Sequence, residues 1–138
     1  MKMDKMFNNP IAFFTIVIIL GACTMQVPAN FIESPSRRYQ LKVDLNRDKS
    51  DEKNYNCVAL AICDTSYREL SRLQTGASNN MKWAVGWYPV HDTLILNSKD
   101  IGVHAYKISE NHQLLNIPVG KEIEQQAEII FTSKYADK

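Results

Sequence analysis

The chain has 138 residues, of which 45% are hydrophobic, and its 16 basic and 15 acidic residues give a formal net charge of +1. This near-neutral balance argues against a nucleic-acid partner, because nucleic-acid-binding domains carry a basic surface. The length fits one compact domain behind a short N-terminal extension. No composition shift or internal repeat predicts a second domain.

The N-terminal segment has the pattern of a secretory signal peptide. Lys2 and Lys5 precede a nearly unbroken apolar run from Ile11 to Leu20, and Gly21-Ala22-Cys23 follows it. This run is shorter than the roughly twenty residues that span a bilayer, so an uncleaved membrane anchor is the less favoured interpretation.

This segment resembles bacterial lipoprotein precursors, in which the chain is cleaved before the cysteine and lipid is attached to that residue. The resemblance implies a signal peptide over residues 1–22 and lipidation of Cys23. Because Thr24 rather than Asp follows the cysteine, it also implies the outer membrane, with the protein facing the periplasm. Acyl chains of this kind fix the location of a protein and not its activity.

Residues 25–38 contain Pro28, Asn30, Pro35 and Ser36 and show no apolar period. Such a composition is typical of a linker. The sequence therefore predicts a lipidated cysteine and tether over 23–38 and a folded domain over 39–138.

The folded part begins with two segments of strand character separated by a polar loop. Tyr39, Leu41, Val43 and Leu45 alternate with polar residues, which is typical of a half-buried strand. Residues 46–56 are polar and charged except for Tyr55, and they predict a solvated loop. The next segment, Cys57 to Cys63, is apolar on both faces and predicts a central strand.

Cys57 and Cys63 form an even pair once Cys23 is lipidated, and in an oxidising compartment such a pair suggests a disulfide. A strand would separate them by about 20 Å, whereas the Cα atoms of a disulfide lie roughly 4.4 to 6.8 Å apart. Two buried thiols are the favoured interpretation, and the disulfide stays open as the alternative. No metal site is expected, because no second cysteine pair or nearby histidine completes a zinc-like set.

Beyond Asp64 the pattern changes. Ser66 and Glu69 have capping-box spacing and Gly76 suits a C-terminal stop, so a short helix is predicted over 66–75, followed by a loop over 76–80. The remaining predicted strands are Lys82–Tyr88, Thr93–Leu96, Gly102–Ile108, Leu114–Val119 and Glu128–Thr132. Many short strands with one short helix predict a mainly-β fold arranged as a β-sandwich.

The order of these pieces resembles the outer-membrane lipoprotein of the type VI secretion system, the TssJ (SciN) family. The strand Leu41-Lys42-Val43-Asp44, the polar loop, and the apolar strand Val58 to Ile62 occur in that family's order. Asp100-Ile101-Gly102-Val103-His104-Ala105-Tyr106 is similar to a later strand of the family, and Leu115-Asn116-Ile117-Pro118-Val119 to the segment after it. The likeness spans roughly residues 39–132.

The resemblance implies a transthyretin-like or immunoglobulin-like β-sandwich that holds the periplasmic domain of a large inner-membrane protein of the secretion complex, TssM. It implies no cofactor other than the covalent lipid on Cys23. In the family the loop after the first strand makes much of the contact, and here the matching residues are Asn46, Arg47, Asp48, Lys49, Asp51, Glu52 and Lys53. The chain lacks the Gly and Pro residues common in that loop, and Cys63-Asp64-Thr65 replaces a Tyr-Gln-Leu segment.

The same loop can be weighed without the family. Its charges alternate in sign, which is most often only a solvated surface. A loop of mixed charge also suits a partner of mixed charge, since complementary pairs steer association and fix register.

The sequence does not predict an enzyme. His91, His104 and His112 are scattered, and His104 is expected at the surface or at an interface because it alternates with Val103 and Ala105. There is no nucleophile elbow, phosphate loop or His-Glu-x-x-His motif. Glu122 and Glu124 have the spacing of the carboxylates in ADP-ribosyltransferases, with Arg38 as a possible arginine, but an exposed strand edge is the simpler interpretation.

Trp83 and Trp87 share a parity and would lie on one face of a strand, where core packing is favoured over a binding platform. Three functions remain. The chain is a structural lipoprotein of a trans-envelope secretion machine, a pilotin-like escort lipoprotein that binds a secretin helix in an apolar cleft, or a periplasmic ligand- or inhibitor-binding module that uses the tryptophan face. The first is favoured.

Overall fold

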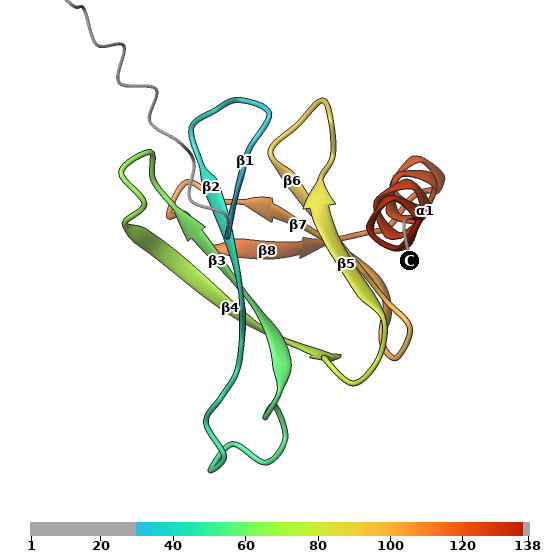
Figure 1. Ribbon diagram of the computed structural model, residues 1–138. Coiled ribbons are helices and arrows are strands. Elements are labelled where there is room, and N and C mark those ends of the chain that lie inside the picture. Colours follow the sequence, from blue (N-terminus) through green and yellow to red (C-terminus); the bar gives the residue numbers. More distant parts are fainter. Residues whose placement is uncertain (1–29, 137–138) are drawn as a thin grey trace, which may run out of the picture.

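The computed structural model describes residues 30–136, which form two four-stranded antiparallel sheets and one helix (Figure 1). The first sheet has the order β1 (Phe31–Glu33), β2 (Gln40–Leu45), β3 (Cys57–Cys63), β4 (Glu69–Ser78). The second has the order β5 (Trp83–Trp87), β6 (Thr93–Ser98), β7 (Gly102–Ile108), β8 (Leu114–Ile117), and α1 (Lys121–Tyr135) follows it. The prediction of a mainly-β sandwich with one short helix is confirmed.

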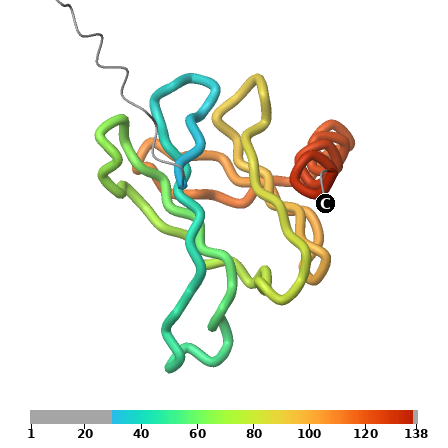
Figure 2. The backbone as a smooth tube through the Cα atoms, viewed as in Figure 1, coloured from blue at the N-terminus to red at the C-terminus, as the bar shows by residue number. Residues whose placement is uncertain are grey.

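Each sheet is a meander, because strands that follow one another in the chain are also neighbours in the sheet. Immunoglobulin domains instead exchange strands between their two sheets through Greek-key connections. The chain therefore builds one sheet completely before it begins the other, and the turn after β4 is the crossing point (Figure 2).

The core lies between the sheets and is centred on β3. All seven residues of β3 are buried, which confirms the predicted central strand. Its inward side chains meet those of β2, β5, β6 and β7 in a cluster that includes Leu41, Val58, Leu60, Ile62, Trp87, Leu94, Leu96 and Tyr106. The predicted strand at β2, the loop over 46–56, and the strands at β5, β6, β7 and β8 are confirmed within one to two residues.

The helix α1 covers the other face of the second sheet and makes a third layer (Figure 1). A Cβ atom at Gly86 would come within 3.0 Å of the Ile130 side chain, so the missing side chain is what lets the helix approach β5. Asn97 of β6 donates from Nδ2 to the backbone oxygen of Ala127 at 3.1 Å. This layer buries β6 on both faces.

The predicted strand over Glu128–Thr132 is wrong, because these residues belong to α1. The apolar run Ile129-Ile130-Phe131 indicated a strand, but a short apolar run does not distinguish a strand from a helix. Ile129 points away from the sheet and is 57% exposed, whereas Ala127 is fully buried. Acidic residues in the first turn and Lys134 in the last turn also complement the helix dipole.

The helix predicted over 66–75 is also wrong, because β4 occupies Glu69–Ser78. The loop predicted over 76–80 is wrong for residues 76–78, which belong to β4, and right for Asn79 and Asn80, which form a turn. Asp64 accepts hydrogen bonds from the N–H groups of Ser66 and Arg68, at 2.9 and 3.0 Å, and so closes a tight turn into β4. Tyr67 in this turn has φ 64°, a left-handed conformation that a helix cannot contain. The capping-box spacing of Ser66 and Glu69 therefore does not mark a helix here, because Ser66 lies in the turn and Glu69 begins β4.

The predicted tether over 23–38 is wrong for residues 31–33, which form β1 and pair with Gln40–Lys42 of β2. The folded domain therefore begins before residue 39. The predicted signal peptide over 1–22 and Cys23 lie outside the described residues. Within residues 30–136, α1 is the only helix, and it is neither long nor apolar enough to cross a bilayer.

Candidate protein-binding site

The loop over residues 46–56 projects from the end of the sandwich beyond the ends of β2 and β3 (Figures 1 and 2). Its base continues the pairing of the two strands. The Asn46 N–H donates to Cys57 O at 2.8 Å, and the Asn56 N–H donates to Asn46 O at 2.7 Å. Asn56 has φ 59°, a conformation that asparagine tolerates better than most residues.

Asp51 organises the interior of the loop. Its carboxylate accepts from Asn46 Nδ2 at 2.9 Å and from Asn54 Nδ2 at 3.2 Å, and its backbone oxygen accepts from the Tyr55 N–H at 2.8 Å. On the other side of the loop, Asn46 Oδ1 accepts from the Asp48 N–H at 2.9 Å. Asn46 and Asp51 are thus only partly exposed and hold the loop in shape.

The other five predicted site residues, Arg47, Asp48, Lys49, Glu52 and Lys53, are exposed on the outside of the loop. The Ser50 hydroxyl and N–H donate to the Asp48 carboxylate, at 2.6 and 2.9 Å, and lower the pKa of Asp48 below its ordinary value. Within residues 30–136, Lys49, Glu52 and Lys53 form no ion pair. The loop therefore presents mixed charges from a fixed backbone.

A second segment, which the sequence did not indicate, lies against this loop. The Asn79 N–H donates to Asn56 O at 2.9 Å, and Asn56 Nδ2 donates to Asn80 Oδ1 at 3.2 Å. The pairing of β3 with β4 brings these residues together, because Cys57 lies opposite Ser78. We call the loop 46–56 with residues 79–81 the tip surface.

Two large apolar side chains are exposed on the tip surface. Tyr55 is 40% exposed and Met81 is 46% exposed. Tyrosine and methionine are enriched in protein interfaces, whereas lysine and glutamate are depleted from interface centres. The tip surface thus combines apolar contact area with charges that can select a partner.

The tryptophans pack as core, as predicted. Trp87 is 8% exposed and donates from Nε1 to the backbone oxygen of Ile32 at 3.0 Å. Trp83 is partly buried against the core, and Lys134 Nζ lies 3.3 Å from the centre of its ring. Neither indole face is laid out as an open platform.

Cys57 and Cys63 are free, buried thiols on one face of β3, which confirms the favoured interpretation over the disulfide. Burial raises the pKa of both thiols. The thiolate is the reactive form, so both cysteines are protected by low exposure and by low ionisation.

A thiol-specific reagent should therefore label Cys57 and Cys63 of the folded protein slowly, on the order of a hundredfold slower than in denaturant, because labelling needs the strand to open. Mass spectrometry without reductant should find both thiols free after unfolding. Recovery of neither thiol in the unfolded protein would contradict the structure.

The other residues considered for chemistry are not brought together. Glu122 and Glu124 lie in the first turn of α1, not at the exposed strand edge that was the simpler interpretation. Arg38 lies in the turn after β1, and its Nη2 is 3.7 Å from Asp92 Oδ2. His104, expected at the surface or at an interface, is partly exposed, and its Nε2 lies 2.9 Å from Ile101 O. Within residues 30–136, no three His, Cys, Asp or Glu side chains are grouped to hold a metal ion.

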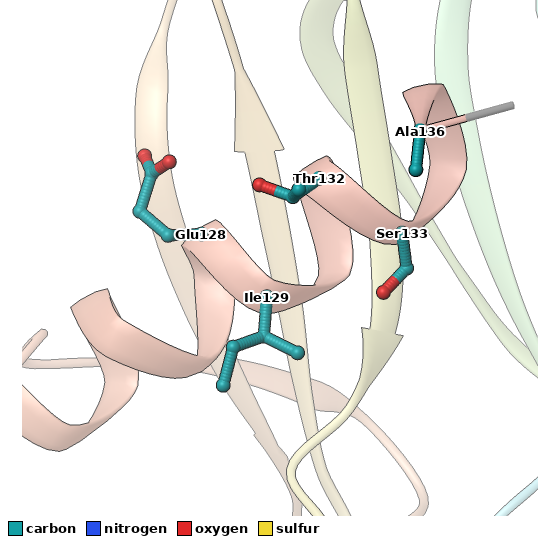
Figure 3. A pocket seen from close by; sticks show the side chains of 5 residues that line it. All are labelled: Glu128, Ile129, Thr132, Ser133 and Ala136. Carbon is teal, nitrogen blue, oxygen red and sulfur yellow. The ribbon is translucent and has the colours of Figure 1, made fainter. Parts of the chain in front are cut away.

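A hollow of about 360 Å³ lies on the outer side of α1 and is lined by residues of that helix and by Ala136 directly after it: Glu128, Ile129, Thr132, Ser133 and Ala136 (Figure 3). It is a shallow surface feature and holds no converging set of polar groups. The tip surface is therefore the better candidate for a binding site.

Comparisons with known proteins do not extend this result. No protein-family model matches the chain, and neither a curated protein nor a solved structure matches it.

Proposed function

We propose that this chain is an outer-membrane-anchored periplasmic lipoprotein that holds the periplasmic domain of an inner-membrane secretion protein, as its resemblance to the TssJ family implies. The observation that carries the proposal is the projecting loop over 46–56, which is fixed by its own hydrogen bonds around Asp51. In this role the chain is a structural component and not an enzyme.

A loop fixed in this way is suited to binding a protein. Association costs free energy for each loop and side chain that must become ordered, so a loop that is already ordered loses less on binding. The exposed Lys49, Glu52 and Lys53 can then meet complementary charges, which steer association and exclude wrong partners. Tyr55 and Met81 supply apolar area beside them.

The two alternatives have less support. A pilotin-like escort needs an apolar cleft that takes a helix, whereas the groove of about 290 Å³ beside β1, β2 and β5 is small and is lined in part by the polar residues Asn30 and Lys134. A ligand-binding module built on the tryptophans needs an open indole face, and Trp87 is buried.

The test is affinity purification of the tagged, detergent-extracted full-length protein from its native host, with mass spectrometry of what binds. A large inner-membrane protein with a periplasmic domain is expected. Exchanging the charges of Lys49→Glu with Glu52→Lys should reduce its recovery about tenfold or more, because like charges facing each other cost several kcal/mol. Neither residue takes part in the bonds that hold the loop.

The matched control is Lys107→Glu with Glu110→Lys, an equal exchange of exposed charges on the hairpin of β7 and β8. It should leave recovery unchanged, and both variants should unfold at the temperature of the wild type. A secretin in place of the inner-membrane protein would support the pilotin alternative, and equal recovery with both variants would rule out the tip surface as the contact.

A further inference from the structure

Most of the acidic side chains at the tip surface hold the chain itself in shape. Asp51 uses both carboxylate oxygens in this way: Oδ2 accepts from Asn46 Nδ2 at 2.9 Å, and Oδ1 accepts from the Asn54 N–H at 3.3 Å. Asp48 Oδ1 accepts from both the N–H and the hydroxyl of Ser50. A carboxylate that accepts from its own chain keeps its charge, but it has fewer positions left for a donor from outside.

The basic side chains of the loop face outward instead. Lys49 and Lys53 are exposed, and within residues 30–136 they form no hydrogen bond, ion pair or ring contact. Arg47 Nη1 donates to Asn56 Oδ1 at 3.0 Å, which is a neutral acceptor and leaves the charge of Arg47 unpaired. In the same part of the chain, Glu52 is the one acidic side chain of the loop that is exposed and unbonded. The charges of the loop alternate in the sequence, but the structure sorts them by sign.

The same sorting continues in the turn between β6 and β7, which lies beside the end of the tip surface (Figure 1). The Lys99 N–H donates to Lys82 O at 3.0 Å, and Lys82 directly follows the tip surface. Asp100 of this turn accepts from the Ser78 N–H at 2.9 Å and from the Ser98 hydroxyl. Its carboxylate thus also serves the chain's own donors.

The two lysines beside this turn are exposed and lie against aromatic rings of α1. Lys82 Nζ is 5.1 Å from the centre of the Tyr135 ring, and Lys99 Nζ is 4.7 Å from the centre of the Phe131 ring. The face of an aromatic ring attracts a cation but carries no net charge, so it positions the ammonium group without neutralising it. Lys82 and Lys99 therefore extend the row of outward cations.

We propose that the tip surface, extended by Lys82 and Lys99, binds an acidic face of its partner protein, whose carboxylates meet Lys49 and Lys53. The inference rests on the proposed function and names the chemistry of the partner. An ammonium group that loses water at a contact must gain an acceptor, because an unpaired charge is costly to bury. Carboxylates are the acceptors that form the strongest bonds with such donors.

An anionic lipid surface also attracts cations, but the tip surface is better suited to a protein. Attraction to a charged membrane depends on the number of basic residues near it and not on their exact positions. Here the backbone that carries Lys49 and Lys53 is fixed by the bonds of Asp51. A fixed backbone loses less conformational freedom on binding and favours a partner whose own charges are fixed.

The first test joins amines to the carboxylates that they touch. The complex of the tagged full-length protein, purified from its native host, is treated with a water-soluble carbodiimide, which couples a lysine to a contacting carboxylate with loss of water and without a spacer. Mass spectrometry should find Lys49 or Lys53 joined to an Asp or Glu of the partner. The exposed Lys107 and Lys121, outside the tip surface, should not be joined to it. A complex linked through Glu52 alone, or with neither Lys49 nor Lys53 joined to the partner, would overturn the proposal.

The second test removes charges of one sign at a time. Lys49→Gln with Lys53→Gln should reduce recovery of the partner about tenfold, because two charge pairs are lost. Glu52→Gln should change recovery less than twofold. The matched control is Lys107→Gln with Lys121→Gln, which removes the same charge from exposed positions and should leave recovery unchanged. All three variants should unfold at the temperature of the wild type, and a larger loss with Glu52→Gln than with the two lysine changes would contradict the proposal.

The two proposals fail in different ways. If Lys49→Glu with Glu52→Lys releases the partner but Lys49→Gln with Lys53→Gln does not, the proposed function stands and the acidic face is wrong. If the same two glutamine changes spare the partner and instead abolish binding of the soluble Cys23→Ser protein to phosphatidylglycerol vesicles, the cations serve a lipid surface. If no partner is recovered with the wild type, both proposals are wrong.

Discussion

Replacing Cys23 by serine is expected to move the protein from the membrane fraction to the soluble periplasmic fraction. The hydroxyl of serine cannot receive the thioether-linked lipid that the resemblance to lipoprotein precursors implies. One acyl chain gives only reversible binding, at about 0.8 kcal/mol per buried methylene, whereas several chains together give attachment that is effectively permanent. Loss of the anchor is therefore an all-or-none change in location, and secretion should fail with it.

Density-gradient fractionation and incorporation of labelled palmitate measure this effect. Thr24→Ala, next to Cys23 in the chain, keeps the thiol and is the control: it should incorporate palmitate and stay in the membrane. The soluble Cys23→Ser protein should still be folded. Secretion that persists with the protein free in the periplasm would show that anchoring is not part of the mechanism.

Strands were predictable where the sequence alternates or is apolar throughout. The alternation at β2 and the fully apolar β3 were readable because each face of a strand meets one environment. β4 was missed because a register shift between Ile62 and Cys63 interrupts its alternation near Leu70, and because Ser66 and Glu69 imitate a helix cap. The tight turn that leads into β4 in place of a helix depends on the positive φ of Tyr67, and the residue type does not predict that conformation.

The helix α1 was missed for a different reason. Its inward residues, such as Ala127 and Ile130, follow a helical period, but the adjacent Ile129 and Phe131 make the same segment look like a short strand. What selects the helix is the contact with Gly86 and Asn97 on the second sheet. That contact joins residues about thirty positions or more apart, and no local pattern contains it.

The candidate site was predictable only in part. The run of charges located the loop, but it did not separate Asn46 and Asp51, which hold the loop, from Lys49, Glu52 and Lys53, which face outward. Charge type cannot make that distinction, because a carboxylate can serve as a hydrogen-bond acceptor or as a surface charge.

Residues 79–81 join the site only through strand pairing and were not predictable at all. The strand β1 was likewise not predicted, because the sequence had indicated a tether at that position.

Leu60→Ala is expected to lower the free energy of unfolding by about 2–5 kcal/mol, the cost of emptying a fully buried site that cannot collapse. Leu60 is fully buried at the middle of β3 and lies opposite Val43 of β2 and Leu73 of β4, so its loss leaves a cavity at the centre of the first sheet. For a domain of this size the midpoint temperature of thermal unfolding should fall by on the order of 10–20 °C. Urea unfolding can be followed by tryptophan fluorescence, since Trp87 is in the core.

The matched control is Leu115→Ala on β8, which removes the same atoms from a side chain that is 43% exposed. Away from the core such a change costs about 0.5 kcal/mol or less. A native domain is stable by only about 5–15 kcal/mol, so the Leu60 variant should also lose tip-surface binding at lower temperature than the wild type does. Equal destabilisation by the two leucine substitutions would mean that β3 is not the centre of the core, and the order of strands in the first sheet would be wrong.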